Sequence, residues 1–262
     1  MFWAERDNLQ RVRSLGVRYG QLGIPGGMQL TDAAAAQWKA ALASAGLTLV
    51  TVFAAYQGED YADIPAVART VGFVPPETRA ARVERTLAVS DFAALLGVSS
   101  IACHIGFVPQ DPGHPDYATV REVVRRVCDH AARHGQNFAL ETGQEPADIL
   151  LQFFKDVDRL NVRINFDPAN MIMYDKGDPV KALHILAPWI RQVHIKDARR
   201  TKVPGTWGEE VPVGTGEVDW RGFFSTFKHV VFNVNLAIER EYGNNRVGDI
   251  RTARELMERT FS

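Results

Sequence analysis

Strand-like runs recur along this chain at intervals of roughly 25–30 residues, and stretches with helical periodicity separate them. Alternation of this kind is typical of repeated βα units, which build a parallel sheet. We expect strands at Phe2–Ala4, Val17–Ile24, Leu47–Ala54, Ser99–Ile105, Asn137–Thr142, Val162–Asp167, Ile190–Lys196 and Asn235–Arg240. Eight strands are the number that closes a (β/α)8 TIM barrel.

The segments between these strands repeat apolar residues at helical spacing. One stripe consists of Val120, Val123, Val124, Val127, Cys128 and Ala131, and another of Trp220, Phe223, Phe224 and Phe227. The 262 residues suit one barrel, which typically needs about 250. No linker or low-complexity tract divides the sequence, so we expect a single domain over residues 1–262. The longest loops, 57–79, 106–117 and 197–216, follow strands, where barrel active sites lie.

The charge balance argues against binding to nucleic acids or to anionic membranes. Lysine and arginine total 30, aspartate and glutamate total 31, and no basic run occurs. No apolar stretch approaches the roughly 20 residues of a membrane span, and no signal peptide is recognisable. With only Cys103 and Cys128 present, we expect a reduced, cytoplasmic environment. Phe2–Ala4 resembles the tail of a strand and not the beginning of a chain. The question whether the native chain begins upstream of Met1, with a leader that is removed, therefore stays open.

Four consecutive expected strands end at a residue that can bind a metal ion: Glu141, Asp167, His194 and Glu239. Adjacent barrel strands lie about 4.8 Å apart, so side chains at their carboxyl ends can converge on one mouth. Three carboxylates and one imidazole suit Mn²⁺, Mg²⁺, Co²⁺ or Zn²⁺. Each residue alone would be ordinary at a strand end. The succession of four predicts a site for one divalent metal ion.

The sequence around these residues reads ALETGQE, NFDPANMIMY, VHIKDAR, VPVGTGEVDW and AIEREYG. From about Val17 onward, it resembles the xylose isomerase-like barrel superfamily, and particularly its sugar phosphate isomerase/epimerase branch. In epimerases of that branch, a Glu, an Asp, a His and a Glu on strands five to eight hold one divalent ion. The first and last glutamates are also thought to form the acid/base pair. The resemblance therefore implies that Glu141 and Glu239 are catalytic residues as well as ligands.

The resemblance also implies a reaction. A metal ion chelated by a keto-sugar lowers the pKa of the C–H bond beside the carbonyl, and a carboxylate can then remove that proton to give a cis-enediolate. Reprotonation would isomerise or epimerise a keto-sugar or sugar phosphate. Expulsion of a β-hydroxyl would instead define a metal-dependent dehydratase of a keto-polyol, similar to inosose dehydratase, and this alternative stays open. Relatives are commonly dimers or tetramers, so we expect a homo-oligomer.

Further candidates for contacts to the sugar are His104, Asn170, Lys196, Arg200 and Trp207. Arg200 matches a substrate-contacting arginine of the ketose 3-epimerases, and it or Lys202 could meet a phosphate. Lys196 could equally form a supporting ion pair with Asp197. Asn170 stands where those epimerases usually carry a histidine, and Ala147 where they carry a second glutamate. These two departures weaken the expectation of a free-ketose 3-epimerase.

Other functional classes fit the sequence less well. DNA-repair enzymes of the endonuclease IV family share this barrel, but they hold three zinc ions through additional histidines. This chain has Phe53, Ala54 and Ala55 after the third strand and Asn170 on the sixth. A non-catalytic sugar-binding barrel would not need all four ligands. Gly214-Thr215-Gly216 is too short for a dinucleotide fingerprint. We expect the histidines on helices to be structural or solvent-exposed, namely His130, His134, His184 and His229.

Overall fold

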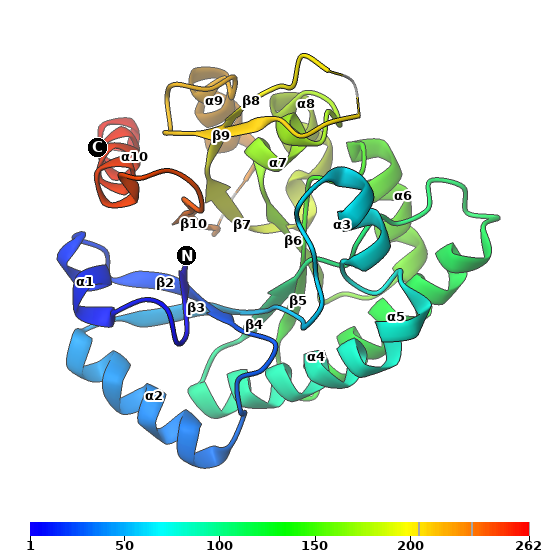
Figure 1. Cartoon of the computed structure of the whole chain (residues 1–262), viewed down its shortest axis with the longest axis horizontal. Helices are drawn as coiled ribbons and strands as arrows, with labels where there is room; N and C mark the ends of the chain where they lie inside the picture. Colours follow the sequence, from blue (N-terminus) through cyan, green and yellow to red (C-terminus); the bar gives the residue numbers. More distant parts are fainter. Residues whose placement is uncertain (204, 232, 262) are drawn as a thin grey trace.

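The computed structural model describes residues 1–203, 205–231 and 233–261, and an eight-stranded parallel sheet forms the centre of this part (Figure 1). Its strands are β1 Phe2–Trp3, β2 Tyr19–Ile24, β3 Thr48–Ala54, β4 Ser100–Cys103, β5 Asn137–Glu141, β6 Val162–Phe166, β7 Ile190–Ile195 and β10 Asn235–Ile238. They follow one another in chain order, from β1 through β7 to β10. Between β10 and β1, the Met1 amino group donates a hydrogen bond to the Ile238 carbonyl. The predicted fold class and strand count are confirmed.

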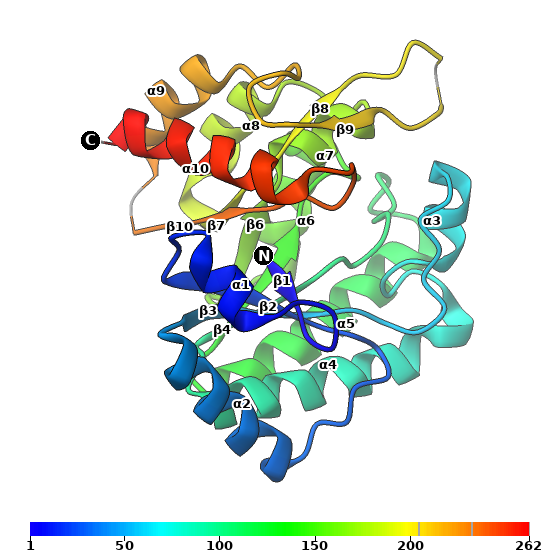
Figure 2. The same cartoon turned by 60° about the vertical axis from the view of Figure 1, so that its left-hand side comes forward.

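Helices cover the outside of the sheet, as Figures 1 and 2 show. They are α1 Leu9–Ser14, α2 Asp32–Ala45, α3 Ile64–Thr70, α4 Pro76–Leu96, α5 Pro115–Ala132, α6 Ala147–Val157, α7 Pro168–Met173, α8 Pro179–Leu186, α9 Trp220–Val230 and α10 Arg246–Phe261, with a short 3₁₀ helix at Ala187–Trp189. Side-chain caps begin several of them; the Thr31 hydroxyl, for example, accepts a hydrogen bond from the Ala34 amide. Gly46 ends α2 in the left-handed conformation that glycine adopts readily. In the described ranges, every helix is too short or too polar to cross a bilayer.

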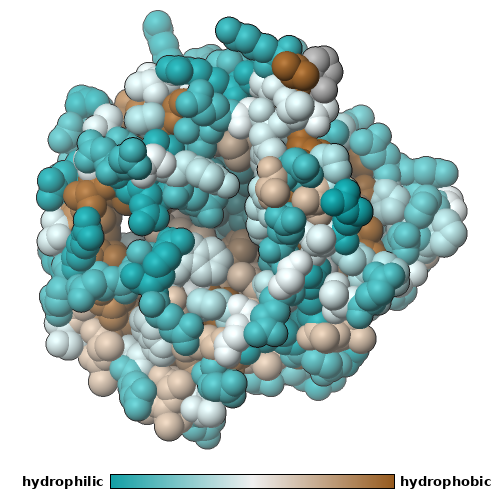
Figure 3. Space-filling view, in the orientation of Figure 1, coloured by the Kyte–Doolittle hydropathy of each residue, from teal (hydrophilic) through white to brown (hydrophobic). Residues whose placement is uncertain are grey.

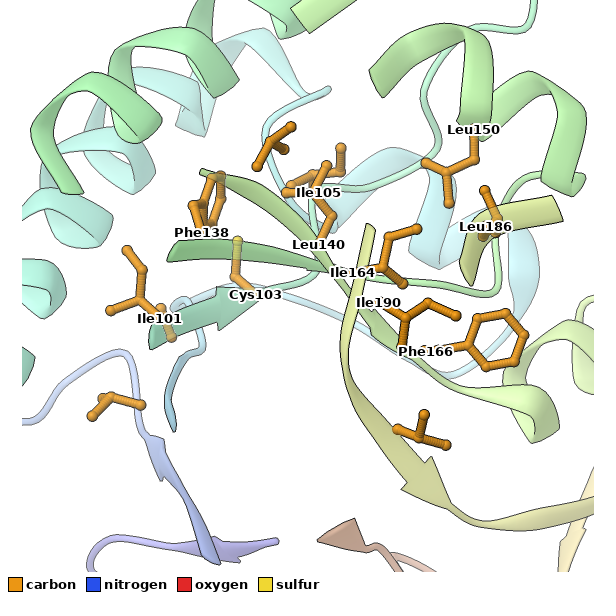
Figure 4. Close-up of a cluster of buried hydrophobic side chains, with 14 of the residues drawn as sticks. Ile101, Cys103, Ile105, Phe138, Leu140, Leu150, Ile164, Phe166, Leu186 and Ile190 are labelled. Atoms are coloured by element: carbon orange, nitrogen blue, oxygen red, sulfur yellow. The ribbon is translucent and has the colours of Figure 1, made fainter. Parts of the chain in front are cut away.

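The main core lies between the sheet and the helices. Val120, Val124 and Val127 of α5 are fully buried, as the stripe on this helix predicts. Leu150 of α6 and Leu186 of α8 face strand side chains such as Ile164 and Ile190 (Figure 4). The two cysteines, Cys103 and Cys128, are free and buried. On each strand, the side chains between those that pack into this core point into the barrel interior.

A buried polar layer fills the barrel interior. The Gln21 side chain donates to Gln192 Oε1 over 2.5 Å and to Asn165 Oδ1 over 3.3 Å. Gln192 in turn donates to the hydroxyls of Ser100 and Thr51. Asn165 and Gln192 lie two residues before the predicted metal ligands Asp167, which follows β6, and His194, which lies in β7. This layer therefore supports the ligands from below.

A hairpin stands above the barrel where the sequence suggested only a loop. Strands β8 Asp197–Arg199 and β9 Glu209–Val211 pair antiparallel. The hairpin lies above β7 and beside α7 (Figure 1). The Asp197 carboxylate stabilises the base of the hairpin, because it accepts hydrogen bonds from Gly214, Gly216 and Trp220. One of the three longest predicted loops thus contains a hairpin over the mouth of the barrel.

Candidate metal centre

The structure brings the four predicted metal ligands together. Glu141 ends β5, Asp167 follows β6 as the N-cap of α7, His194 lies in β7, and Glu239 follows β10. The Nδ1 atom of His194 is 3.3 Å from Glu141 Oε1, 3.3 Å from Asp167 Oδ2 and 3.2 Å from Glu239 Oε2. All four side chains are buried, and their ligand atoms lie within 4.8 Å of one another. Such a buried set of anionic and imidazole donors is suited to a divalent cation.

Hydrogen bonds orient each ligand. The Nε2 atom of His194 lies 2.8 Å from Gln21 Oε1 and 3.0 Å from the Asn165 amide nitrogen. Burial alone would lower the pKa of His194, but the charges of Glu239 and Glu141 outweigh it and raise the pKa well above its usual value. A bound divalent ion would replace the proton on Nδ1, while the proton on Nε2 stays donated to Gln21. Asp167 Oδ1 accepts the amide of Asn170 over 2.9 Å at the start of α7. This bond turns the other oxygen, Oδ2, toward His194.

The two oxygens of Glu141 have different surroundings. Oε1 belongs to the ligand cluster and also accepts a hydrogen bond of 3.1 Å from the Asn170 side chain. Oε2 lies 3.4 Å from His104 Nε2. His104 is held in turn by Gln144, whose side-chain nitrogen lies 3.2 Å from His104 Nδ1. One oxygen of Glu141 can therefore bind a metal ion while the other exchanges a proton.

Lys196 is a buried cation beside the ligands. Its Nζ lies 2.9 Å from Glu239 Oε2, 3.0 Å from Glu241 Oε2 and 3.6 Å from Asp167 Oδ2. Burial alone would lower the pKa of Lys196, but the charges of Glu239 and Glu241 outweigh it and raise the pKa well above its usual value. Burial likewise opposes ionisation of Glu239, yet His194 and Lys196 hold its pKa well below the usual value. The pair is therefore an ammonium and a carboxylate, which neutralises part of the acidic cluster.

A cavity of about 820 Å³ opens above the ligands. Glu141 and Glu239 line it, whereas Asp167 and His194 do not. The lining also includes four of the residues that were predicted to contact substrate, namely His104, Asn170, Lys196 and Trp207. Figure 3 shows the face drawn in Figure 1, which is largely hydrophilic and is hollowed near its centre.

Arg200 does not line this cavity. Its guanidinium group pairs with the carboxylate of Asp175 and lies 3.9 Å from that of Glu217. Both partners are exposed, and Arg200 is thus engaged outside the cavity lining. A substrate contact by Arg200 stays a prediction that this arrangement does not favour.

Several cavity residues escaped the sequence reasoning. Glu210, on the hairpin, accepts a hydrogen bond of 2.7 Å from Arg240 and one of 3.0 Å from the Glu241 amide. Burial raises the pKa of Glu59, which accepts the Gly72 amide over 3.0 Å. Glu241 could have been found, because it lies two residues after Glu239. Glu59 lies in a loop and Glu210 in β9, and neither belongs to a motif.

Two histidines on the outer layer are less isolated than expected. The Nε2 atoms of His130 and His134 lie 2.7 and 2.8 Å from Asp91 Oδ1, between α4 and the end of α5. These three residues also have the spacing of metal ligands. None of them lines the cavity. The interval of four residues between the histidines is a signal that sequence reasoning could have used.

Residues 9–260 match the xylose isomerase-like TIM barrel family, and the chain belongs to this family. A xylose isomerase domain protein from Planctomyces limnophilus is 40% identical, with a TM-score of 0.94 over 98% of this chain and 94% of that one. A xylose isomerase-like protein from Mycobacterium smegmatis, solved in complex with magnesium, is 19% identical, with a TM-score of 0.71 over 96% and 86% of the two chains.

More distant comparisons support the fold alone. Similar solved structures include D-psicose 3-epimerase from Clostridium cellulolyticum H10, which is 18% identical with a TM-score of 0.70 over 97% of this chain and 92% of that one. They also include other epimerases and a probable 3-DHS dehydratase. The uncharacterized protein YihM of Escherichia coli is 28% identical over 144 residues, which span 52% of this chain and 42% of that protein.

Proposed function

We propose that this protein is a divalent-metal-dependent isomerase or epimerase of a keto-sugar. The observation that carries the proposal is the convergence of three carboxylates on His194 Nδ1 beneath a cavity of about 820 Å³. Fold similarity to sugar epimerases supports it.

The donor set fits one hard or borderline divalent ion. Glu141, Asp167, His194 and Glu239 would hold it, and Gln21 would fix the imidazole from behind. When bound, such an ion would polarise a carbonyl and a neighbouring hydroxyl of the sugar and so acidify the intervening C–H bond. Mn²⁺, Mg²⁺, Co²⁺ and Zn²⁺ all suit these donors.

Glu141 and Glu239 would move the proton. Glu141 uses Oε2, the oxygen on the His104 side, to take the proton from the carbon beside the carbonyl. Glu239 reaches the site from β10, and β6 and β7 separate that strand from β5 in the sheet. It can therefore meet the opposite face of the sugar and return there a proton that the neighbouring Lys196 ammonium passes to it. Lys196 holds Glu239 in place through their 2.9 Å ion pair and can donate a hydrogen bond to a substrate oxygen.

A dehydratase of a keto-polyol is the second candidate. Loss of a β-hydroxyl needs an acid near the departing oxygen. His104 lines the cavity 3.4 Å from Glu141 and would be the donor of that proton. The similar fold of a probable dehydratase is compatible with this reaction.

The test is solvent exchange. Metal-loaded protein is incubated in D₂O with a panel of keto-sugars, and mass spectrometry follows deuterium uptake and any product lighter by one water. We expect uptake into at least one sugar, and Glu141→Gln should reduce its rate by about 100-fold or more. Glu122→Gln, an exposed change on α5, is the matched control and should leave the rate unchanged. Absence of both exchange and water loss, with metal bound, would refute the proposal.

A further inference from the structure

We infer that the cavity takes an uncharged keto-sugar that carries a second ring, such as a glycoside, in preference to a phosphorylated or acidic sugar. This inference rests on the proposed function and names its substrate class. Three observations carry it: the size of the cavity, its aromatic lining and the pairing of its cations.

The cavity is larger than one sugar ring requires. Its volume of about 820 Å³ lies in the upper part of the range of about 300–1,000 Å³ found for pockets that enclose drug-sized ligands. The metal ligands lie at its floor, with Glu141 and Glu239 buried. The rim includes Tyr61 and Tyr242, whose exposed fractions are 38% and 59%. A sugar bound at the floor therefore leaves space between itself and the rim.

Aromatic side chains line this space in two groups. Phe53 and Tyr61 each contact the His104 ring, with centroid separations of 5.8 and 6.0 Å. Tyr174 and Trp207 contact each other at 4.7 Å, from α7 and the hairpin loop. Aromatic faces bind the apolar faces of rings. The exposed Tyr242 adds a third such surface at the rim, where a second ring would lie.

The charges in the lining disfavour an anionic substrate. Six glutamates face the cavity, namely Glu59, Glu141, Glu209, Glu210, Glu239 and Glu241, against the cations Lys196, Arg240 and Arg6. Each of these cations already has a carboxylate partner. Lys196 pairs with Glu239 and Glu241, Arg240 with Glu210 and Asp249, and Arg6 with Asp7. A phosphate group would therefore have to displace one of these carboxylates from its partner.

Equilibrium binding tests the inference without turnover. Metal-loaded protein is titrated calorimetrically with phenyl glucoside, methyl glucoside and glucose 6-phosphate. We expect the phenyl glucoside to bind at least about fivefold more tightly than the methyl glucoside, and the phosphate to bind most weakly. Tyr242→Ala should remove the preference for the phenyl group. Tyr19→Ala, another exposed tyrosine that does not line this cavity, should retain it.

Equal affinity for the two glucosides, tighter binding of the phosphate, or no detectable binding of any of the three would overturn the inference. Preference for the phenyl glucoside that survives both Tyr242→Ala and Tyr61→Ala would overturn it as well. These ligands lack a keto group, so their binding is independent of solvent exchange. Failure of the substrate class is therefore distinguishable from failure of the proposed chemistry.

Discussion

Replacement of Asp197 by asparagine tests how the cavity wall is held. Asp197 is 1% exposed and begins the hairpin that carries Glu210. Its carboxylate accepts five hydrogen bonds: Oδ1 from the amides of Ala198 and Val218 at 2.9 and 3.1 Å, and Oδ2 from the amides of Gly214 and Gly216 and the indole of Trp220 at 2.8, 3.1 and 2.9 Å. One buried side chain thus links β8 to the loop that follows β9 and to the first residue of α9.

The cost of the substitution follows from these contacts. Asparagine has one acceptor oxygen and one NH₂ group. Even in its better orientation, with the oxygen toward Trp220, the NH₂ faces the Ala198 and Val218 amides, which then lose their acceptor. A buried donor without a partner costs about 1–3 kcal/mol. We therefore expect Asp197→Asn to lower the free energy of unfolding by about 2–4 kcal/mol, and Asp197→Ala to lower it further.

Equilibrium unfolding in urea provides the assay, with the free energy extrapolated linearly to water. Asp175→Asn is the matched control, because it removes a surface carboxylate that pairs with Arg200 and should change the free energy by less than about 0.5 kcal/mol. Metal affinity should change little in Asp197→Asn, because the hydrogen bonds of Asp197 run to its own hairpin and to the start of α9 and not to the four ligands. A loss of stability below about 1 kcal/mol in Asp197→Asn would refute the reasoning.

Two further predictions concern buried polar residues. Gln21→Leu should weaken metal binding by about 10–100-fold, because the Nε2 atom of His194 loses the Gln21 oxygen as its acceptor. Titration with Mn²⁺ measures the affinity, and an unchanged affinity would count against this role of Gln21. Burial raises the pKa of Glu145 to about 8 although the Val108 amide donates to it, so the folded state binds this proton more tightly than the unfolded chain. The stabilisation that comes from binding this proton is therefore lost as the pH rises through about 8. Between pH 6 and pH 9, the free energy of unfolding of Glu145→Gln should rise by about 2–3 kcal/mol relative to that of the wild type. Parallel pH profiles of urea unfolding for the two proteins would contradict this expectation.

The strand order and the ligand cluster could be predicted because both depend on local patterns. In a βα repeat, the residue that ends a strand lies at the barrel mouth, so Asp167 and Glu239 could be placed from their neighbours in the sequence. Strand limits were less accurate. The ladder of β4 ends at Cys103, whereas the prediction ran to Ile105, because the last residues turn toward the next loop.

The remaining features depend on contacts between distant residues. Gln21 and Gln192 are 171 positions apart, and no local pattern pairs them. The hairpin depends on Asp197, whose partners lie up to 23 residues away. The ion pair between Arg200 and Asp175 is a further example, since the two residues are 25 positions apart and no local pattern pairs them.

The central claim is that Glu141, Asp167, His194 and Glu239 hold one divalent metal ion. Elemental analysis of Mn²⁺-supplemented and desalted protein tests it most directly, with circular dichroism to verify that each variant is folded. We predict about one equivalent of metal in the wild type and in His134→Ala, which alters only the outer histidine pair, and its loss in both His194→Ala and Glu239→Ala. Absence of metal from the wild type, or full retention in both ligand variants, would contradict the account.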